Sequence, residues 1–300
     1  MTAALSPQRW AIRIHQILDA VFGADKFPID IAAIAKEFTA QICPDDPILS
    51  VRGDDLPGFD GALFRAPKGR QGWGIIYNDR LSSKGRINFT LGHELGHYLM
   101  HREAYPNGFQ CGDGDFLPWG SECGQIEHQA NVFAASLLMP YDDFRQQIDP
   151  NARVDLDMLS ECAARYRVSL IAATLRWLSY TAKRAVLVVS RDGFIEWARS
   201  SERALKTRAY FRTSGAPVEL PDRSLAAQQD LLLGGSGSMK HDGGVWFAEP
   251  VHEMSLYAEQ YEFGLSLLLL EDDVDWRTFG SEREKDTYDR FVPPQQRREW

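Results

Sequence analysis

Two histidines and a glutamate near residue 95 have the spacing of a metal-dependent hydrolytic site. They form the pattern His93-Glu94-x-x-His97 within residues 84–101, a segment predicted to be helical. Residues four apart share one helix face and lie about 6 Å apart along the axis, so both imidazoles can bind one Zn²⁺. Glu94 lies about 100° round the helix, where its carboxylate can take a proton from a metal-activated water and pass it to a leaving amine. The pattern predicts a zinc peptidase site with Glu94 as the catalytic acid and base.

A catalytic zinc needs a third protein ligand and one open coordination position. The H-x-x-G-x-x-H extension of the motif is absent, because Met100 stands where its glycine would be. We predict that Glu127, in a second predicted helix over residues 122–138, is the third ligand. Four other residues of suitable type stay open as alternatives: His101, Glu122, Cys123 and His128.

Helical geometry separates these alternatives. Glu122 and His128 point about 140° and 100° away from the Glu127 face if the helix is regular. His101 continues the row of the two motif histidines, and three ligands in one straight row suit a tetrahedral site poorly. We therefore expect His101 and His128 to be solvated or to contact a ligand from outside, and Cys123 to be a reduced loop thiol.

The helix that carries Glu127 has a second useful feature on the same face. Ala130, Asn131 and Ala134 share that face with Glu127, and the small alanines allow close packing against the motif helix. Asn131, one turn after Glu127, can hydrogen-bond the outer ring nitrogen of a ligand histidine. Such partners fix the tautomer and orientation of a metal-bound imidazole.

Two sequence blocks together resemble the ImmA/IrrE-type metallopeptidases. The first is residues 86–101, and the second comprises residues 127–131, 133–135 and 137–140. The His-Glu-x-x-His pattern alone occurs in many unrelated zinc peptidases, so the pairing of the blocks carries the resemblance. It covers residues 72–180 well and the rest of the chain more weakly. One departure is Gln129, where the family often has another acidic residue.

The resemblance implies a zincin-like, gluzincin-type domain in which His93, His97 and Glu127 bind one Zn²⁺ and Glu94 is the acid and base. It implies a protein substrate, since family members cut a helix-turn-helix transcriptional repressor in phage-like elements or stress responses. Other members sit beside an antitoxin-like regulator. The radiation-response branch also carries a C-terminal domain resembling a GAF sensor, and the length of residues 185–300 suits such a domain.

The substrate side of the site is less defined. Zincins commonly hold an extended peptide against an edge strand through main-chain hydrogen bonds. Residues 73–77, a compact predicted strand before the motif helix, are the candidate for that edge. Tyr98, His101 and His128 stay open as groups that could stabilise an oxyanion.

The hydrophobic pattern predicts an α+β fold with three parts. Residues 1–150 form the zincin-like domain, with helices over 8–22, 84–101 and 122–138 and another capped by Asp30. Residues 151–183 contain two helical stretches that resemble a helix-turn-helix. Residues 184–300 are a smaller mixed α/β domain. Its predicted strands span 185–190, 194–199, 245–247, 251–256 and 263–270, the first two joined by Asp192-Gly193, and residues 234–238 are a predicted loop.

Composition narrows the function classes. The chain has 300 residues, 44% of them hydrophobic and 25% charged, which is ordinary for a globular protein. The net charge of −9 favours neither nucleic acid nor membrane surfaces as partners. A signal peptide, a membrane-spanning run and C-x-x-C pairs are all absent from the sequence, so we expect a cytoplasmic protein with reduced thiols.

Two other functions compete with the peptidase. The first is a DNA-binding or scaffolding regulator with a structural zinc. Its phosphate contacts would come from five cations: Arg165, Arg167, Arg176, Lys183 and Arg184. A structural zinc would not need Glu94, which weighs against this alternative. The second is a toxin-like protease that an antitoxin partner holds inactive.

Overall fold

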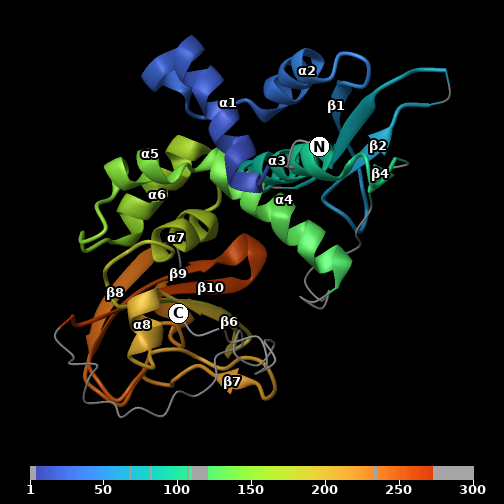
Figure 1. The fold of residues 1–300 in the computed structure, drawn as a ribbon. Coiled ribbons are helices and arrows are strands. Elements are labelled where there is room, and N and C mark those ends of the chain that lie inside the picture. The colour runs from blue at the N-terminus through green and yellow to red at the C-terminus, as the bar shows by residue number, and fades with distance from the viewer. Residues whose placement is uncertain are drawn as a thin grey trace, which may run out of the picture.

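The computed structural model describes residues 5–67, 69–81, 83–106, 108–109, 121–232 and 235–272. Helices and two sheets follow one another along the chain (Figure 1). The helices are α1 (Pro7–Phe22), η1 (Gly23–Lys26), α2 (Ile31–Ile42), α3 (Lys84–His101), α4 (Glu122–Leu138), α5 (Tyr141–Gln147), α6 (Leu156–Tyr166), α7 (Leu170–Leu178), α8 (Glu202–Lys206), η3 (Gln229–Leu232) and η4 (Glu259–Tyr261). The strands are β1 (Ile48–Asp54), β2 (Gly61–Arg65), β3 (Trp73–Asn78), β4 (Gly108–Phe109), β5 (Ala185–Arg191), β6 (Phe194–Ser200), β7 (Val218–Glu219), β8 (Ser236–His241), β9 (Val251–Ala258) and β10 (Phe263–Leu270).

The first sheet has the strand order β1-β3-β2-β4. Strand β3 pairs in parallel with β1 and antiparallel with β2, so it lies inside the sheet. The prediction that residues 73–77 form an edge strand is therefore wrong. It failed because β1 was not foreseen: only one position of that strand is fully buried, and its sequence shows little apolar alternation.

Helices α3 and α4 lie at the centre of the N-terminal part, with α1 packed against α4 (Figure 1). The predicted helix over residues 8–22 and the predicted cap at Asp30 are confirmed here, although Ile17, Val21 and Phe22 of α1 are exposed. Ser6 and Asp30 accept hydrogen bonds at the first turns of α1 and α2, and Ile14 and Leu18 of α1 are buried. In the described part of the chain, no helix combines the length and the apolar character that a membrane span requires.

The second sheet is antiparallel, with the order β7-β6-β5-β10-β9-β8. The Asp192-Gly193 hairpin is confirmed, and both residues have the positive φ that such a two-residue turn needs. One strand prediction and one loop prediction are wrong. Residues 245–247 lie in a tight turn closed by a hydrogen bond from Gly244 N to Phe247 O, which buries Trp246 without a strand. Within residues 234–238, the described residues from Ser236 onward begin β8.

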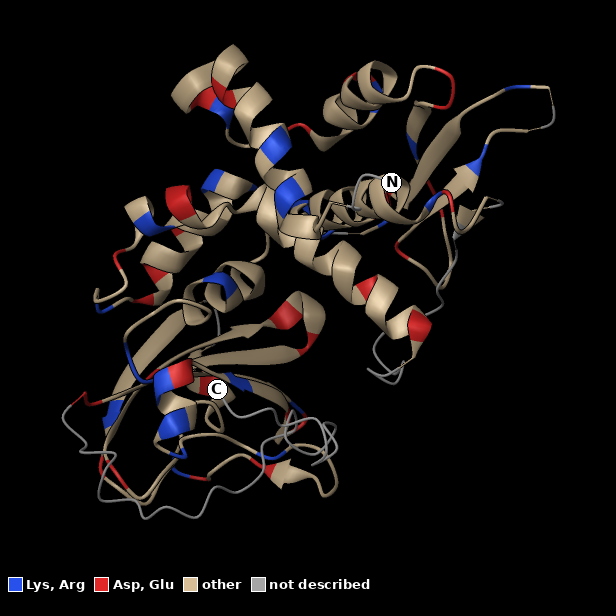
Figure 2. Ribbon diagram, viewed as in Figure 1, with Lys and Arg blue, Asp and Glu red and all other residues tan. Residues whose placement is uncertain are grey.

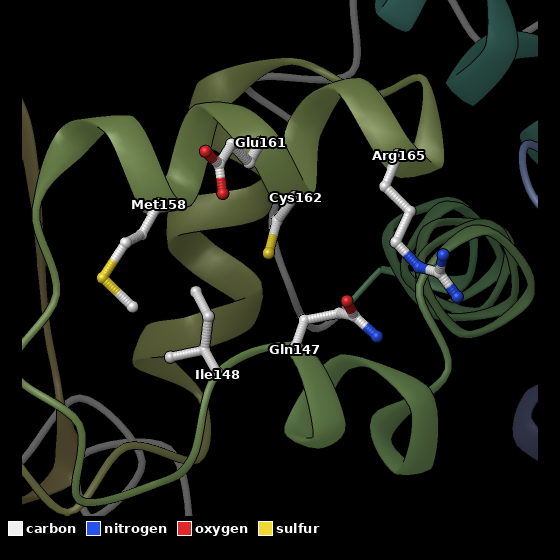
Figure 3. A pocket seen from close by; sticks show the side chains of 6 residues that line it. All are labelled: Gln147, Ile148, Met158, Glu161, Cys162 and Arg165. Carbon is white, nitrogen blue, oxygen red and sulfur yellow. The ribbon is translucent and has the colours of Figure 1, made fainter.

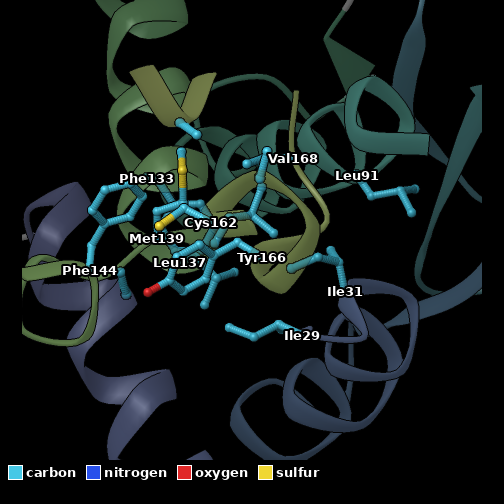
Figure 4. Close-up of a cluster of buried hydrophobic side chains, with 14 of the residues drawn as sticks. Ile29, Ile31, Leu91, Phe133, Leu137, Met139, Phe144, Cys162, Tyr166 and Val168 are labelled. Atoms are coloured by element: carbon cyan, nitrogen blue, oxygen red, sulfur yellow. The ribbon is translucent and has the colours of Figure 1, made fainter. Parts of the chain in front are cut away.

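One hydrophobic core joins the helices to the inner face of the second sheet. Its helical residues come from α1 to α7 and the segments that connect them, and Figure 4 shows part of this cluster. Alternate residues of β5, β9 and β10, among them Leu187, Met254 and Leu267, belong to the same cluster. A second cluster, which includes Val188 and Leu268, covers the other face of this sheet beside α8. The predicted boundary at residue 183 thus precedes β5, but the core continues across it.

Candidate metal centre

Three side chains from two helices converge on one point. His93 and His97 project from α3, and Glu127 projects from the first turns of α4. The Nε2 atoms of the two histidines are 2.8 Å apart, and they lie 3.0 and 3.3 Å from the two carboxylate oxygens of Glu127. Among the described residues, this is the group of His, Cys, Asp and Glu side chains that could hold a metal ion.

The donor set fits zinc. Two ligands at about 2.1 Å from a tetrahedral zinc are about 3.4 Å apart, so the nitrogen–oxygen distances need little change and the nitrogens must separate by about half an ångström. Two imidazoles and one carboxylate also leave the fourth position open, as a catalytic zinc requires. The His97 side chain is 2% exposed, and those of His93 and Glu127 are 15% and 16% exposed, so the site is shielded but reachable.

Small residues bring the two helices close enough for this convergence. Gly92 and Gly96 of α3 face Ala130 and Ala134 of α4. A Cβ atom at Gly96 would lie 3.0 Å from Phe133 Cδ1, whereas one at Gly92 would lie 3.3 Å from the nearest atom, the Cβ of Ala134. The close packing expected from the alanines is therefore present, and the glycines of the motif helix form its other half.

Glu94 lies beside the three converging groups, under strand β2. It is 6% exposed, accepts a hydrogen bond from the backbone amide of Leu63, and its Oε2 has no partner among the described residues. Gly61 leaves room for this arrangement, since a Cβ there would lie 2.5 Å from Thr90 Cγ2. Burial is the main reason that the pKa of Glu94 rises to about 7. A carboxylate with that pKa can both accept and release a proton near neutral pH.

The three converging groups influence one another's protonation. Burial lowers the pKa of His97 to about 4, so this imidazole is neutral and can offer a lone pair to a metal. Burial opposes ionisation of Glu127, but its hydrogen bonds with His93 and His97 outweigh that effect and hold its pKa well below the usual range. The site thus presents a neutral imidazole beside an anionic carboxylate, as a cation requires.

Hydrogen-bond partners lie behind both histidines. Asn131 Oδ1 is 3.0 Å from His93 Nδ1, the contact expected for an asparagine one turn after Glu127. His97 Nδ1 lies 3.1 Å from His101 Nδ1, and His101 Nε2 lies 3.1 Å from Gln129 Oε1. Sequence reasoning left His101 as one of several alternatives and gave Gln129 no role. A helical wheel could have placed His101 behind His97, but the reach of Gln129 depends on how α3 and α4 pack.

The other candidates lie outside the converging group. Glu122 accepts a hydrogen bond from Tyr105, while Cys123 and His128 are exposed. Tyr98 is fully buried and donates to the backbone oxygen of Asp46, so this side chain is a core residue and not an oxyanion donor.

A small cavity of about 190 Å³ lies away from this centre, on α5 and α6 (Figure 3). Its lining includes Cys162 and Arg165. Burial raises the pKa of the Cys162 thiol to about 11, and Arg165 is paired with Asp143. The cavity therefore offers neither a reactive thiolate nor an uncommitted charge.

Comparison with known families agrees with this geometry. Residues 45–178 match the Peptidase_M78 family, described as the IrrE N-terminal-like domain. A comparison with curated proteins found no match. The matched segment runs from the loop before β1 to the end of α7 and contains both helices of the metal centre. Residues 45–178 thus resemble the IrrE N-terminal-like peptidase domain, in agreement with the resemblance carried by the paired sequence blocks.

Proposed function

We propose that the protein is a zinc-dependent metalloendopeptidase in which His93, His97 and Glu127 hold the metal. The observation that carries this proposal is the convergence of three ligand atoms beside Glu94, a buried carboxylate with one oxygen that lacks a partner among the described residues. A structural zinc site needs only ligands, so a carboxylate held at this position favours catalysis.

The roles of the chain's own groups follow from their positions. When bound, zinc would supply a Lewis acid that polarises the scissile carbonyl and acidifies a water molecule. Glu94 takes the proton of the attacking water at Oε2 and delivers it to the leaving amine nitrogen. The hydrogen bond from Leu63 to Glu94 keeps the carboxylate against β2 during both transfers.

The substrate strand belongs beside β2 in this proposal, not beside β3. On the side of β2 away from β3, β4 pairs only with Leu63 and Phe64 among the described residues. Among the described residues, no strand pairs with Gly61 on this side, and Gly61 lies close to Glu94. An extended peptide that adds to this edge would pass the metal centre with its scissile bond near the acid and base.

The DNA-binding alternative loses its contact residues. Arg176 and Arg184 are buried, the first bonded to Met139 O and the second to Glu249. The two other paired cations are Arg165, with Asp143, and Lys183, with Asp272. Arg167 is the exposed member of the five, and it has no ion pair within the described part of the chain. Basic and acidic positions are interspersed over the ribbon (Figure 2), and α7 lies mostly buried against the second sheet.

The class of protein substrate is inferred from the family resemblance and not from the geometry of the site. We propose that the substrate is a protein, of the helix-turn-helix repressor class that related peptidases cut. An antitoxin-like partner that restrains the peptidase is the alternative. The second sheet, which lies outside the matched residues, is the candidate GAF-like sensor region.

Metal content and cleavage test this function together. Wild type should hold about one zinc per chain, and Glu127→Ala should lose most of it. Glu122→Ala is the matched control, because Glu122 is an exposed carboxylate of the same helix. Glu94→Gln should keep the metal and lose about 10²–10⁴-fold in cleavage of a proteome-derived peptide library. Metal-free wild type, or equal cleavage by wild type and Glu94→Gln, would sink the proposal.

A further inference from the structure

A chain of hydrogen-bonding groups runs outward from His97 to the second helix. His101, one turn after His97 on α3, is 7% exposed. Its Nδ1 faces His97 Nδ1 at 3.1 Å, and its Nε2 faces Gln129 Oε1 at 3.1 Å. Both ring nitrogens of His101 are therefore engaged on the side of His97 opposite to Glu127, so this histidine is not placed to be a metal ligand.

The proton positions along this chain follow from donor and acceptor types. An amide oxygen can only accept, so His101 Nε2 must carry a proton and donate to Gln129. In neutral His101 this leaves Nδ1 with a lone pair, which can only accept from His97 Nδ1. In the zinc-bound form His97 would then carry its proton on Nδ1 and keep the lone pair of Nε2 for the metal.

His93 reaches the same state by a shorter route. Asn131 Oδ1 accepts from His93 Nδ1 directly, so in the zinc-bound form the lone pair of His93 Nε2 would be kept for the metal. Gln129 and Asn131 lie two residues apart on α4, so one helix sets the tautomer of both histidines. At His97, which is 2% exposed, His101 lies between the ring and the amide of Gln129.

We propose that His101 and Gln129 are positioning residues that fix His97 in the tautomer able to bind the metal. The inference rests on the proposed metal centre and adds two residues to it. Gln129 is exposed, but His97 and His101 are buried, so the bond between the two rings acts in a low dielectric, where a lost partner is costly. Groups that orient metal-bound histidines typically contribute about 10–100-fold to metal affinity.

Variants at His101 separate hydrogen bonding from packing. In His101→Asn the side-chain oxygen occupies the position of His101 Nδ1 and still accepts from His97, whereas His101→Leu fills space without accepting. We expect His101→Leu to weaken zinc affinity about 10–100-fold, measured by competition with a chelator, and His101→Asn to recover most of the loss. Equal affinity for His101→Leu and wild type, or equally weak binding by both variants, would overturn the relay.

Substitutions at Gln129 test the outer link. Gln129→Glu keeps an acceptor and should bind zinc nearly as wild type does, whereas Gln129→Met should bind more weakly. Gln125→Met, at an exposed glutamine one turn earlier on α4, is the matched control and should leave affinity unchanged. If Gln129→Met matched Gln125→Met, Gln129 would have no place in the relay.

Nuclear magnetic resonance can test the relay in the wild-type protein, so the result does not depend on whether a variant folds. In zinc-loaded, ¹⁵N-histidine-labelled wild type, the bond between His97 and His101 should give a scalar coupling between their Nδ1 nuclei. His101 should appear as the neutral tautomer protonated at Nε2. One bound zinc with His101 protonated at Nδ1 would overturn the relay and leave the peptidase intact, whereas no bound zinc would remove the proposed function itself.

Discussion

His15 is a titratable side chain buried between α1 and α4. Its Nε2 is 2.9 Å from the carbonyl oxygen of Leu137, and its Nδ1 has no hydrogen-bond partner among the described residues. Burial lowers the pKa of His15, and the charge of Lys26 lowers it further. The bond to Leu137 and the charge of Asp142 oppose these effects only in part. The folded protein thus holds this ring neutral, with Nε2 donating to Leu137.

We predict that His15 makes stability depend on pH on the acid side of neutrality. Its ordinary pKa of 6.5 applies to the unfolded chain, which therefore binds the proton before the folded protein does. The contribution of the neutral ring to stability is complete above pH 6.5 and is lost as the pH falls from that value to the lower folded-state pKa. Below the folded-state pKa this contribution no longer changes with pH. The free energy of unfolding, measured in urea, should therefore decrease as the pH is lowered from about 6.5.

His15→Gln is the matched comparison, because its amide can donate to Leu137 and does not titrate. Its free energy of unfolding should fall less steeply with pH than that of wild type over the same range. Parallel curves for the two proteins would show that the His15 ring is not held neutral.

The metal centre could be predicted because most of it lies within short stretches of helix. The spacing of His93 and His97 and the face shared by Glu127 and Asn131 follow from 3.6 residues per turn. The contacts of Glu94 with Leu63 and of His101 with Gln129 join separate elements, so no local pattern records them. Residue types suggested which groups could take part, but tertiary packing decides which of them meet.

The same limit applies to three polar residues before and within β9. Glu249, His252 and Glu253 form a cluster in sequence, but in the structure they turn to different partners. Glu249 pairs with Arg184, His252 contacts Ser238, and Glu253 is fully buried. The partners of the Glu253 carboxylate are the backbone amides of Leu225 and Ala226 and the side chains of His241, Trp246 and Ser255. These polar positions serve the fold of the second sheet, since the buried carboxylate is satisfied by protein donors.

At the scale of the elements, the contact between α3 and α4 sets the geometry of the site. We predict that Gly96→Ala lowers the free energy of unfolding by up to about 2 kcal/mol. Its new Cβ would lie 3.0 Å from Phe133, and overpacking costs about 1–3 kcal/mol, from which the helix propensity of alanine recovers about 1 kcal/mol. In Gly92→Ala the nearest atom to the new Cβ is the methyl group of Ala134 at 3.3 Å, so its free energy of unfolding should be within about 1 kcal/mol of wild type.

The same pair of variants reports on the metal centre. Pushing α4 away at Gly96 separates Glu127 from both histidines, so zinc affinity should fall in Gly96→Ala and hold in Gly92→Ala. Urea unfolding gives the stabilities, and chelator competition gives the affinities. Equal behaviour of both variants would mean that the helix contact does not control the ligand distances.

Helices and strands were predicted correctly where the sequence has a strong hydrophobic periodicity. Strands were missed where only hydrogen bonding to a neighbouring strand defines them. The stripes of α1 and α2 and the Asp192-Gly193 turn are local signals. Strands β1 and β8 are mostly exposed edge strands with little apolar alternation, so only their partners β3 and β9 define them. The apolar run at residues 245–247 lies in a turn, and its sequence pattern alone does not distinguish a buried turn from a buried strand.

At the scale of the whole molecule, the shared core couples the metal centre to the second sheet. Leu267 on β10 belongs to the cluster that contains Leu95 of α3 and Phe133 of α4, whereas the next residue, Leu268, faces the opposite cluster. Both leucines are fully buried. The chain passes from one part to the other at Arg184, whose guanidinium is bonded to Glu249. These contacts favour a single cooperative unit across residue 183.

The two neighbouring leucines allow a direct test of that coupling. Leu267→Ala and Leu268→Ala should each cost about 2–5 kcal/mol, since both leave a cavity in a packed cluster. If the molecule unfolds as one unit, both variants reduce the amide-exchange protection of α3 and of β10 by similar amounts. If the sheet opens alone, Leu268→Ala lowers protection in β10 and leaves α3 unchanged, because its cavity lies on the face away from the helices. The second result would make the sheet a separate body, able to change shape without disturbing the metal centre. The first would mean that any event which loosens this sheet also loosens the helices that hold His93, His97 and Glu127.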